Sequence, residues 1–185
     1  MSSARPADSP SRAWALARLI LGQIFLHGSM AGMRMAAPLL ALREGYSALA
    51  VGVLLALFSV SQVFLAIPAG RYADRHGLLK PMRLGVVAAV LGGALAGAVP
   101  HFGMLCASAL LMGGATGVAI VALQRHVGRA AQDTTELKQV FSWLAIGPAV
   151  SNFLGPVAAG LLIDHAGVWV GGAAADTNGF RAAFC

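Results

Sequence analysis

Charge, cysteine and catalytic motifs are all scarce in this sequence. Charged residues make up only 11% of the 185 positions, whereas 58% are hydrophobic. This composition excludes an ordinary soluble domain and indicates an integral membrane protein. The two cysteines, Cys106 within an apolar run and Cys185 at the last position, imply no disulfide framework.

The sequence also lacks the signatures of an enzyme. It contains neither H-E-x-x-H nor G-x-S-x-G, and its apolar runs hold no acidic cluster suited to a metal ion. His27 and Ser29 are two residues apart, so on a helix they point about 200° apart and do not form a nucleophile–base pair. We therefore predict no catalytic residue, no metal and no cofactor, and an intramembrane enzyme is the least favoured alternative.

Long apolar runs are abundant. A helix of about 20 mostly apolar residues crosses a bilayer. Five such runs occupy residues 14–40, 49–69, 82–99, 102–123 and 140–163, and a sixth begins at Phe180. We predict an all-α fold, a polytopic transmembrane helix bundle over residues 14–185, preceded by a disordered cytoplasmic tail over residues 1–13.

The basic residues indicate how the bundle is inserted. Ten of the thirteen lysines and arginines lie before or in the first two turns of the first run, between the second run and the start of the third, or after the fourth run, which places them on one side of the membrane. Because basic loops stay in the cytoplasm, we predict an inner (cell) membrane protein with a cytoplasmic N-terminus. The lipid bilayer thus explains the net charge of +6, and no nucleic-acid partner is expected.

The stretch from Gly70 to Arg83 is predicted to be a tight basic loop between the second and third runs. Its distinctive residues are Gly70, Asp74, Arg75, Gly77 and Lys80. Arg125 leaves the fourth run on the same predicted side of the membrane as Asp74, which makes it a candidate member of the same group.

A spacing in this loop recurs later in the chain. Gly70, Asp74 and Gly77 are repeated ninety residues on as Gly160, Asp164 and Gly167. The predicted topology places the two copies on opposite sides of the membrane, as expected for an inverted repeat of three plus three helices. The alternative is that these are independent helix-ending glycines and aspartates.

The first run carries three polar residues on one helix face. Gln23, His27 and Arg34 fall within about a 40° arc. They either line a solute cavity, where Arg34 holds an anionic group, or bond to neighbouring helices while Arg34 reaches the outer surface. Asn152 in the fifth run has the same two interpretations.

Two glycine–proline pairs lie in the fifth run. Gly147-Pro148 and Gly155-Pro156 are followed by Gly160. Proline removes a backbone donor, so we expect this helix to bend.

The basic loop resembles the loop between helices 2 and 3 of the major facilitator superfamily of secondary transporters, with its motif G-x-x-x-D-R/K-x-G-R-R/K-R/K. The matching residues are Gly70, Asp74, Arg75, Gly77 and Lys80, whereas Leu78 and Leu79 replace basic residues. The resemblance implies an N-terminal half of that fold. In it, Asp74 engages the start of a helix in the other half in the outward-facing state, and the neighbouring basic residues lock the two halves together.

The fifth run resembles the G-x-x-x-G-P-x-x-G-G motif of the antiporters in this family. Gly155, Pro156 and Gly160 match, and Ser151 and Ala159 replace glycines. This resemblance implies efflux. Many proton-coupled exporters carry an arginine early in helix 4, but Ala109 stands there, four residues before Gly113, which speaks against proton-coupled antiport.

The combined prediction is a secondary transporter that moves a small solute outward by alternating access. Five runs and the start of a sixth are less than half of such a transporter, so we expect a missing C-terminal half or a partner half. The alternatives are a non-transporting membrane fragment and an uptake permease.

Overall fold

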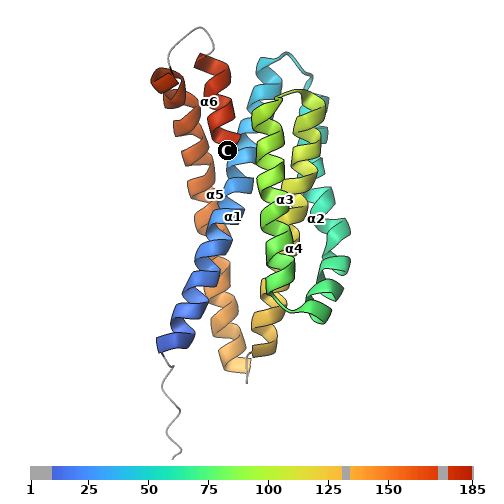
Figure 1. The fold of residues 1–185 in the computed structure, drawn as a ribbon, viewed down its shortest axis with the longest axis vertical. Helices are drawn as coiled ribbons and strands as arrows, with labels where there is room; N and C mark the ends of the chain where they lie inside the picture. Colours follow the sequence, from blue (N-terminus) through green and yellow to red (C-terminus); the bar gives the residue numbers. More distant parts are fainter. Residues whose placement is uncertain (1–9, 131–133, 171–174, 185) are drawn as a thin grey trace, which may run out of the picture.

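The computed structural model describes residues 10–130, 134–170 and 175–184, and these residues form helices and short connections without a strand. The helices are α1 (Pro10–Arg43), α2 (Ala48–His76), α3 (Leu79–Ala98), α4 (Phe102–Ala130), α5 (Thr134–Val170) and α6 (Ala175–Phe184). They run alternately up and down along one long axis (Figure 1). The predicted all-α helix bundle is therefore confirmed.

Four helices, α2 to α5, are long and apolar enough to cross a membrane by length and composition. The sequence predicted five complete spans. The first, α1, does not meet this test because Gln23, His27 and Arg34 lower the hydropathy of its central turns. It still runs the length of the bundle beside α5 (Figure 1), in the place of the predicted first span.

The two largest helix interfaces are related by an exchange of the first three helices with the last three. The two most extensive packing interfaces join α2 to α4 and α1 to α5. If α1, α2 and α3 are matched with α4, α5 and α6, each of these interfaces is converted into the other. The packing thus agrees with the inverted repeat of three plus three helices.

A serine followed by an amide residue extends the repeat beyond the glycine and aspartate pattern. Ser61 and Gln62 of α2 recur ninety residues later as Ser151 and Asn152 of α5. Both serines are buried and bond within their own helix, Ser61 to the Phe58 carbonyl at 3.2 Å and Ser151 to the Gly147 carbonyl at 2.8 Å.

Glycine allows the paired helices to approach closely. A Cβ atom added at Gly155 of α5 would collide with the Gly28 carbonyl oxygen of α1 and lie 2.9 Å from the Gly32 nitrogen. A Cβ atom added at Gly113 of α4 would collide with the carbonyl oxygen of Phe58 in α2. Small residues at such crossings are what membrane helix packing requires.

Aromatic contacts join the helices at the end of the bundle where α1 passes into α2. The rings of Tyr46 and Phe102 stack with centroids 4.6 Å apart. The guanidinium carbon of Arg43 lies 5.0 Å from the ring centroid of Phe180 in α6, within cation–π range.

Several helices extend beyond the predicted apolar spans, because apolarity defines the membrane-embedded length and not the ends of a helix. Residues 10–13, predicted to belong to the disordered tail, begin α1, and the rest of that tail lies outside the described residues. α6 begins at Ala175, five residues before the predicted Phe180. The predicted basic loop shrinks to Gly77 and Leu78, since α2 continues to His76 and α3 starts at Leu79.

The fifth helix is not broken at its prolines. α5 continues through both Pro148 and Pro156. Each proline removes one backbone donor, so the helix continues with one backbone hydrogen bond fewer at each of these positions.

Candidate functional site

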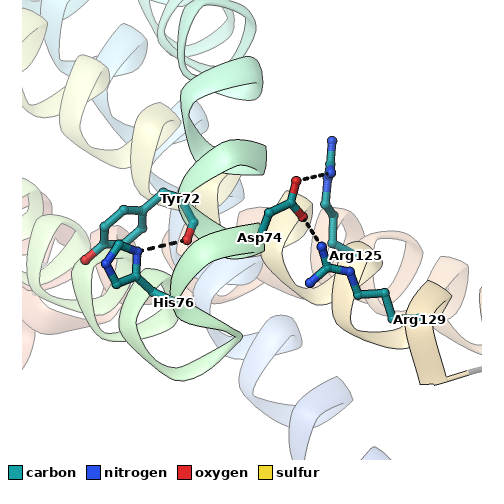
Figure 2. Close-up of polar contacts among 5 residues, drawn as sticks. All are labelled: Tyr72, Asp74, His76, Arg125 and Arg129. Atoms are coloured by element: carbon teal, nitrogen blue, oxygen red, sulfur yellow. Dashed lines mark hydrogen bonds and ion pairs between the residues drawn. The ribbon is translucent and has the colours of Figure 1, made fainter.

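A carboxylate held by two guanidinium groups marks one end of the bundle. Asp74 lies in the last turn of α2, and Arg125 and Arg129 lie near the end of α4. Arg125 Nη1 donates to Asp74 Oδ2 at 2.5 Å, and Arg129 Nη2 donates to Asp74 Oδ1 at 2.7 Å (Figure 2). These charge-assisted bonds tie α2 to α4.

The glycine one turn before Asp74 makes this geometry possible. A Cβ atom added at Gly70 would lie 3.0 Å from Nη2 and 3.2 Å from Nε of Arg125. The guanidinium group therefore lies directly over the Gly70 backbone on its way to Asp74. This packing explains why a glycine stands four residues before the aspartate.

The rest of the predicted motif ends α2 and begins α3. Gly77 has φ +71°, a conformation that favours glycine, and its N–H donates to the Ala73 carbonyl at 2.9 Å. Arg75 and Lys80 are exposed. On the neighbouring side of α2, the rings of Tyr72 and His76 lie 4.4 Å apart, and His76 Nδ1 lies 3.2 Å from the Tyr72 carbonyl oxygen (Figure 2).

Sequence reasoning named Arg125 but missed Arg129. The signal was present, because residues four apart share a helix face, so a second arginine one turn beyond Arg125 points the same way.

The other copy of the repeat has no equivalent arginine. Gly160 corresponds to Gly70, and the nearest atom to a Cβ added there is Cε of Met35, at 3.7 Å. Met35 precedes Arg125 by ninety residues. A thioether thus replaces the guanidinium group, and Asp164, the counterpart of Asp74, is exposed.

The predicted polar face of α1 is only partly buried. Gln23 is 6% exposed and its amide carbon lies 3.5 Å from a Cβ added at Gly147 of α5. Gln23 Oε1 and His27 Nδ1 are buried without a hydrogen-bond partner among the described residues. Arg34 and Asn152 are exposed. The structure therefore brings Gln23 and His27 together as neighbours on α1 but leaves Arg34 and Asn152 on the surface.

A cavity of about 720 Å³ lies elsewhere, between α1, α3, α5 and α6. Its lining is mostly apolar and includes Gly28, Gly32, Val90, Leu154 and Phe184, with Ser29 and Ser151 as its hydroxyl-bearing residues. None of the predicted cavity residues Gln23, His27, Arg34 and Asn152 lines it. Ser29 Oγ donates to the Phe25 carbonyl of its own helix at 2.9 Å.

Comparison with known proteins assigns the architecture. Residues 19–185 match the family described as Major Facilitator Superfamily. The chain belongs to this superfamily. It is 28% identical over 147 residues to the Inner membrane transport protein YajR of Escherichia coli (strain K12), a match that covers 76% of this chain and 32% of the relative. The chain thus spans about a third of the curated relative it matches, and no solved structure matches it.

The glycine–proline motif of α5 packs against α1. Gly155 forms the crossing point described above, and Gly147 faces the Gln23 amide. Ser151, which replaces a glycine of the antiporter motif, donates to the Ile24 carbonyl of α1 at 2.9 Å. A Cβ atom added at Gly160 would make only an ordinary contact with Met35, and Pro148 and Pro156 are half-buried within the continuous helix.

Membership of the superfamily points to a transporter rather than an enzyme, and the apolar helices make the chain a multi-pass integral membrane protein. The described residues hold no group of three or more histidine, cysteine, aspartate or glutamate side chains suited to a metal ion.

Proposed function

We propose that this chain is the N-terminal part of a secondary transporter that exports a small solute by alternating access. We place it in the inner membrane with a cytoplasmic N-terminus. The other half of the solute pathway is proposed to come from a C-terminal half or a partner half, since the chain spans about a third of its relative.

The observation that carries this proposal is the ion-paired cluster of Asp74 with Arg125 and Arg129. It joins α2 to α4 at the end of the bundle that the charge distribution predicts to be cytoplasmic. Alternating access requires contacts that form in one state and break in another. Asp74 is 30% exposed, so its carboxylate can also reach a partner outside this chain.

The solute is proposed to meet the polar side of α1. Buried polar atoms are normally hydrogen-bonded, so the unpartnered Gln23 Oε1 and His27 Nδ1 suit a contact with a solute or its water. Arg34 and Asn152, both exposed, are proposed to face the part of the pathway that the other half completes.

The outward direction rests on the α5 motif of Gly147, Pro148, Gly155, Pro156 and Gly160. Its close crossing with α1 at Gly155 joins this motif to the helix that carries Gln23 and His27. A change in α5 during transport would therefore be transmitted to the proposed solute-contacting helix.

The test is Asp74→Asn in the complete transporter, with efflux of a panel of lipophilic cations and organic acids measured from loaded cells. We expect export of at least one compound by the wild type and a loss of about tenfold or more in the variant, because the neutral amide weakens both charge-assisted bonds. Asp164→Asn is the matched control, since Asp164 faces no arginine at the equivalent position. Normal export by Asp74→Asn, with equal amounts of protein in the membrane, would contradict the proposal.

A further inference from the structure

The start of α3 carries positive charge that no carboxylate of the described residues neutralises. Lys80 and Arg83 are both exposed, and within the described part of the chain neither takes part in an ion pair. The nearby acidic residue, Asp74, is already engaged by Arg125 and Arg129. Arg71 and Arg75 add two exposed cations in the last two turns of α2, which the turn at Gly77 and Leu78 joins to α3.

The N-terminus of α3 strengthens the attraction for an anion. The residue at its N-cap is Leu78, which makes no side-chain capping bond, and the first turn contains no acidic residue. The free N–H groups and the positive end of the helix dipole are therefore not matched by any negative group of the helix itself.

An apolar stripe continues from these cations along α3. Leu84, Val87 and Leu91 are 55%, 56% and 53% exposed, and their spacing of three and four residues from Lys80 onward places them on the same side of the helix. From Leu84 to Leu91 the stripe is about 10 Å long at the rise of an α-helix. Lys80 and Arg83 thus lie at one end of an exposed apolar surface.

We propose that the start of α3 is a binding site for an anionic phospholipid. Lys80, Arg83 and the uncapped helix N-terminus bind the phosphodiester, Arg71 and Arg75 add positive charge, and an acyl chain lies along Leu84, Val87 and Leu91. An amphiphile fits this surface because the charge and the apolar stripe are continuous. A soluble anion or an acidic peptide would use only the cationic end.

The experiment measures lipid binding to the purified 185-residue chain in detergent by native mass spectrometry. Dioleoyl phosphatidylglycerol is compared with dioleoyl phosphatidylcholine, which has the same acyl chains and no net charge. We expect selective binding of phosphatidylglycerol, weakened about 30-fold in Lys80→Gln/Arg83→Gln, because each lysine or arginine near an anionic lipid contributes about fivefold.

The matched control is Arg18→Gln/Lys138→Gln, which removes two exposed cations near the starts of α1 and α5. Both helices start at the end of the bundle where α2 passes into α3 (Figure 1). It is expected to bind phosphatidylglycerol as the wild type does. Equal losses in the two double variants would show a general charge effect and overturn the site. Circular dichroism and monodisperse elution establish that each variant is folded.

Two further ligands identify the source of the phosphate. Dihexanoyl phosphatidylglycerol is expected to bind at least tenfold more weakly than the dioleoyl form, because its chains cover less of the stripe. Inorganic phosphate at millimolar concentration is expected not to displace the dioleoyl lipid. Equal binding of the short-chain lipid, or displacement by phosphate, would mean that the site takes a free anion and would overturn the lipid proposal.

Discussion

At the scale of single residues, the contribution of Asp74 depends on the two arginine side chains that it binds. The carboxylate is 30% exposed and the two arginine side chains are 50% and 59% exposed, so solvent screens both pairs. Exposed pairs of this kind contribute about 0.2–1 kcal/mol each. Such a contact is strong enough to bias a conformational equilibrium and weak enough to be broken when a competing partner arrives.

The coupling between Asp74 and Arg125 is measurable in a double-mutant cycle. We expect Asp74→Asn and Arg125→Gln to be coupled by about 0.5–1 kcal/mol in the free energy of unfolding of the chain in detergent, because each change removes the same bond. The control cycle pairs Asp164→Asn with Met35→Leu, where coupling near zero is expected. Coupling of equal size in both cycles would indicate an effect unrelated to the ion pair.

Gly70 permits a second test of the same contact. In Gly70→Ala the new methyl group would lie 3.0 Å from Arg125 Nη2, so the guanidinium group must shift away from Asp74. We expect the coupling between Asp74 and Arg125 to fall by about half or more when the cycle is repeated in this background. Gly128→Ala, at a glycine of α4 with nothing within 4 Å, is expected to leave the coupling unchanged.

At the scale of helices, the α1–α5 crossing depends on backbone contact. Gly155 lies against Gly28 and Gly32, and Ser151 adds a hydrogen bond to Ile24 one turn away. The glycine–proline motif, from which the sequence predicted a bend, is thus also a packing surface for α1.

Alanine at Gly155 is expected to destabilise the bundle by about 1–3 kcal/mol, because the added methyl group meets the Gly28 carbonyl and neither backbone can move freely. The measurement is the free energy of unfolding in detergent. Gly160→Ala is the control in the same helix, since its nearest contact is the flexible end of Met35 at 3.7 Å. Comparable losses in both variants would argue against a tight crossing at Gly155.

The helices were far more predictable than the contacts between them. Apolar length located the helices of the described residues, although α1 does not meet the length-and-composition test for a membrane span, and the positions of lysine and arginine predict how the helices are oriented. The Gly70 and Asp74 spacing identified the charged cluster, but the second arginine and the role of Gly70 required the three-dimensional packing of α2 on α4. The polar residues of α1 show the limit of periodicity: it placed Gln23 and Arg34 on one face, yet one is buried against α5 and the other is exposed, because the neighbouring helix covers only part of that face.

At the scale of the whole molecule, the inverted pairing of helices predicts the sidedness of each connection. The α2–α3 turn and the α1–α2 connection lie at opposite ends of the bundle (Figure 1). In a chain with Cys106 and Cys185 replaced by serine, His76→Cys is expected to react with an impermeant maleimide only from the cytoplasmic side, and Glu44→Cys only from the other side. Labelling of both cysteines from one side would refute the predicted topology.

Met35 stands in one copy of the repeat where the other copy has Arg125, so a single substitution could create a second ion pair in the bundle. Among the described residues, the ion pairs of Asp74 with Arg125 and Arg129 lie at one end of the bundle, whereas Gly160 and Asp164 lie at the other end with Met35 in place of the arginine. The substitution Met35→Arg would supply a guanidinium group that could pass over the Gly160 backbone and bind the Asp164 carboxylate. One substitution would thus give the bundle an ion pair at each end, and raising the salt concentration would weaken both pairs.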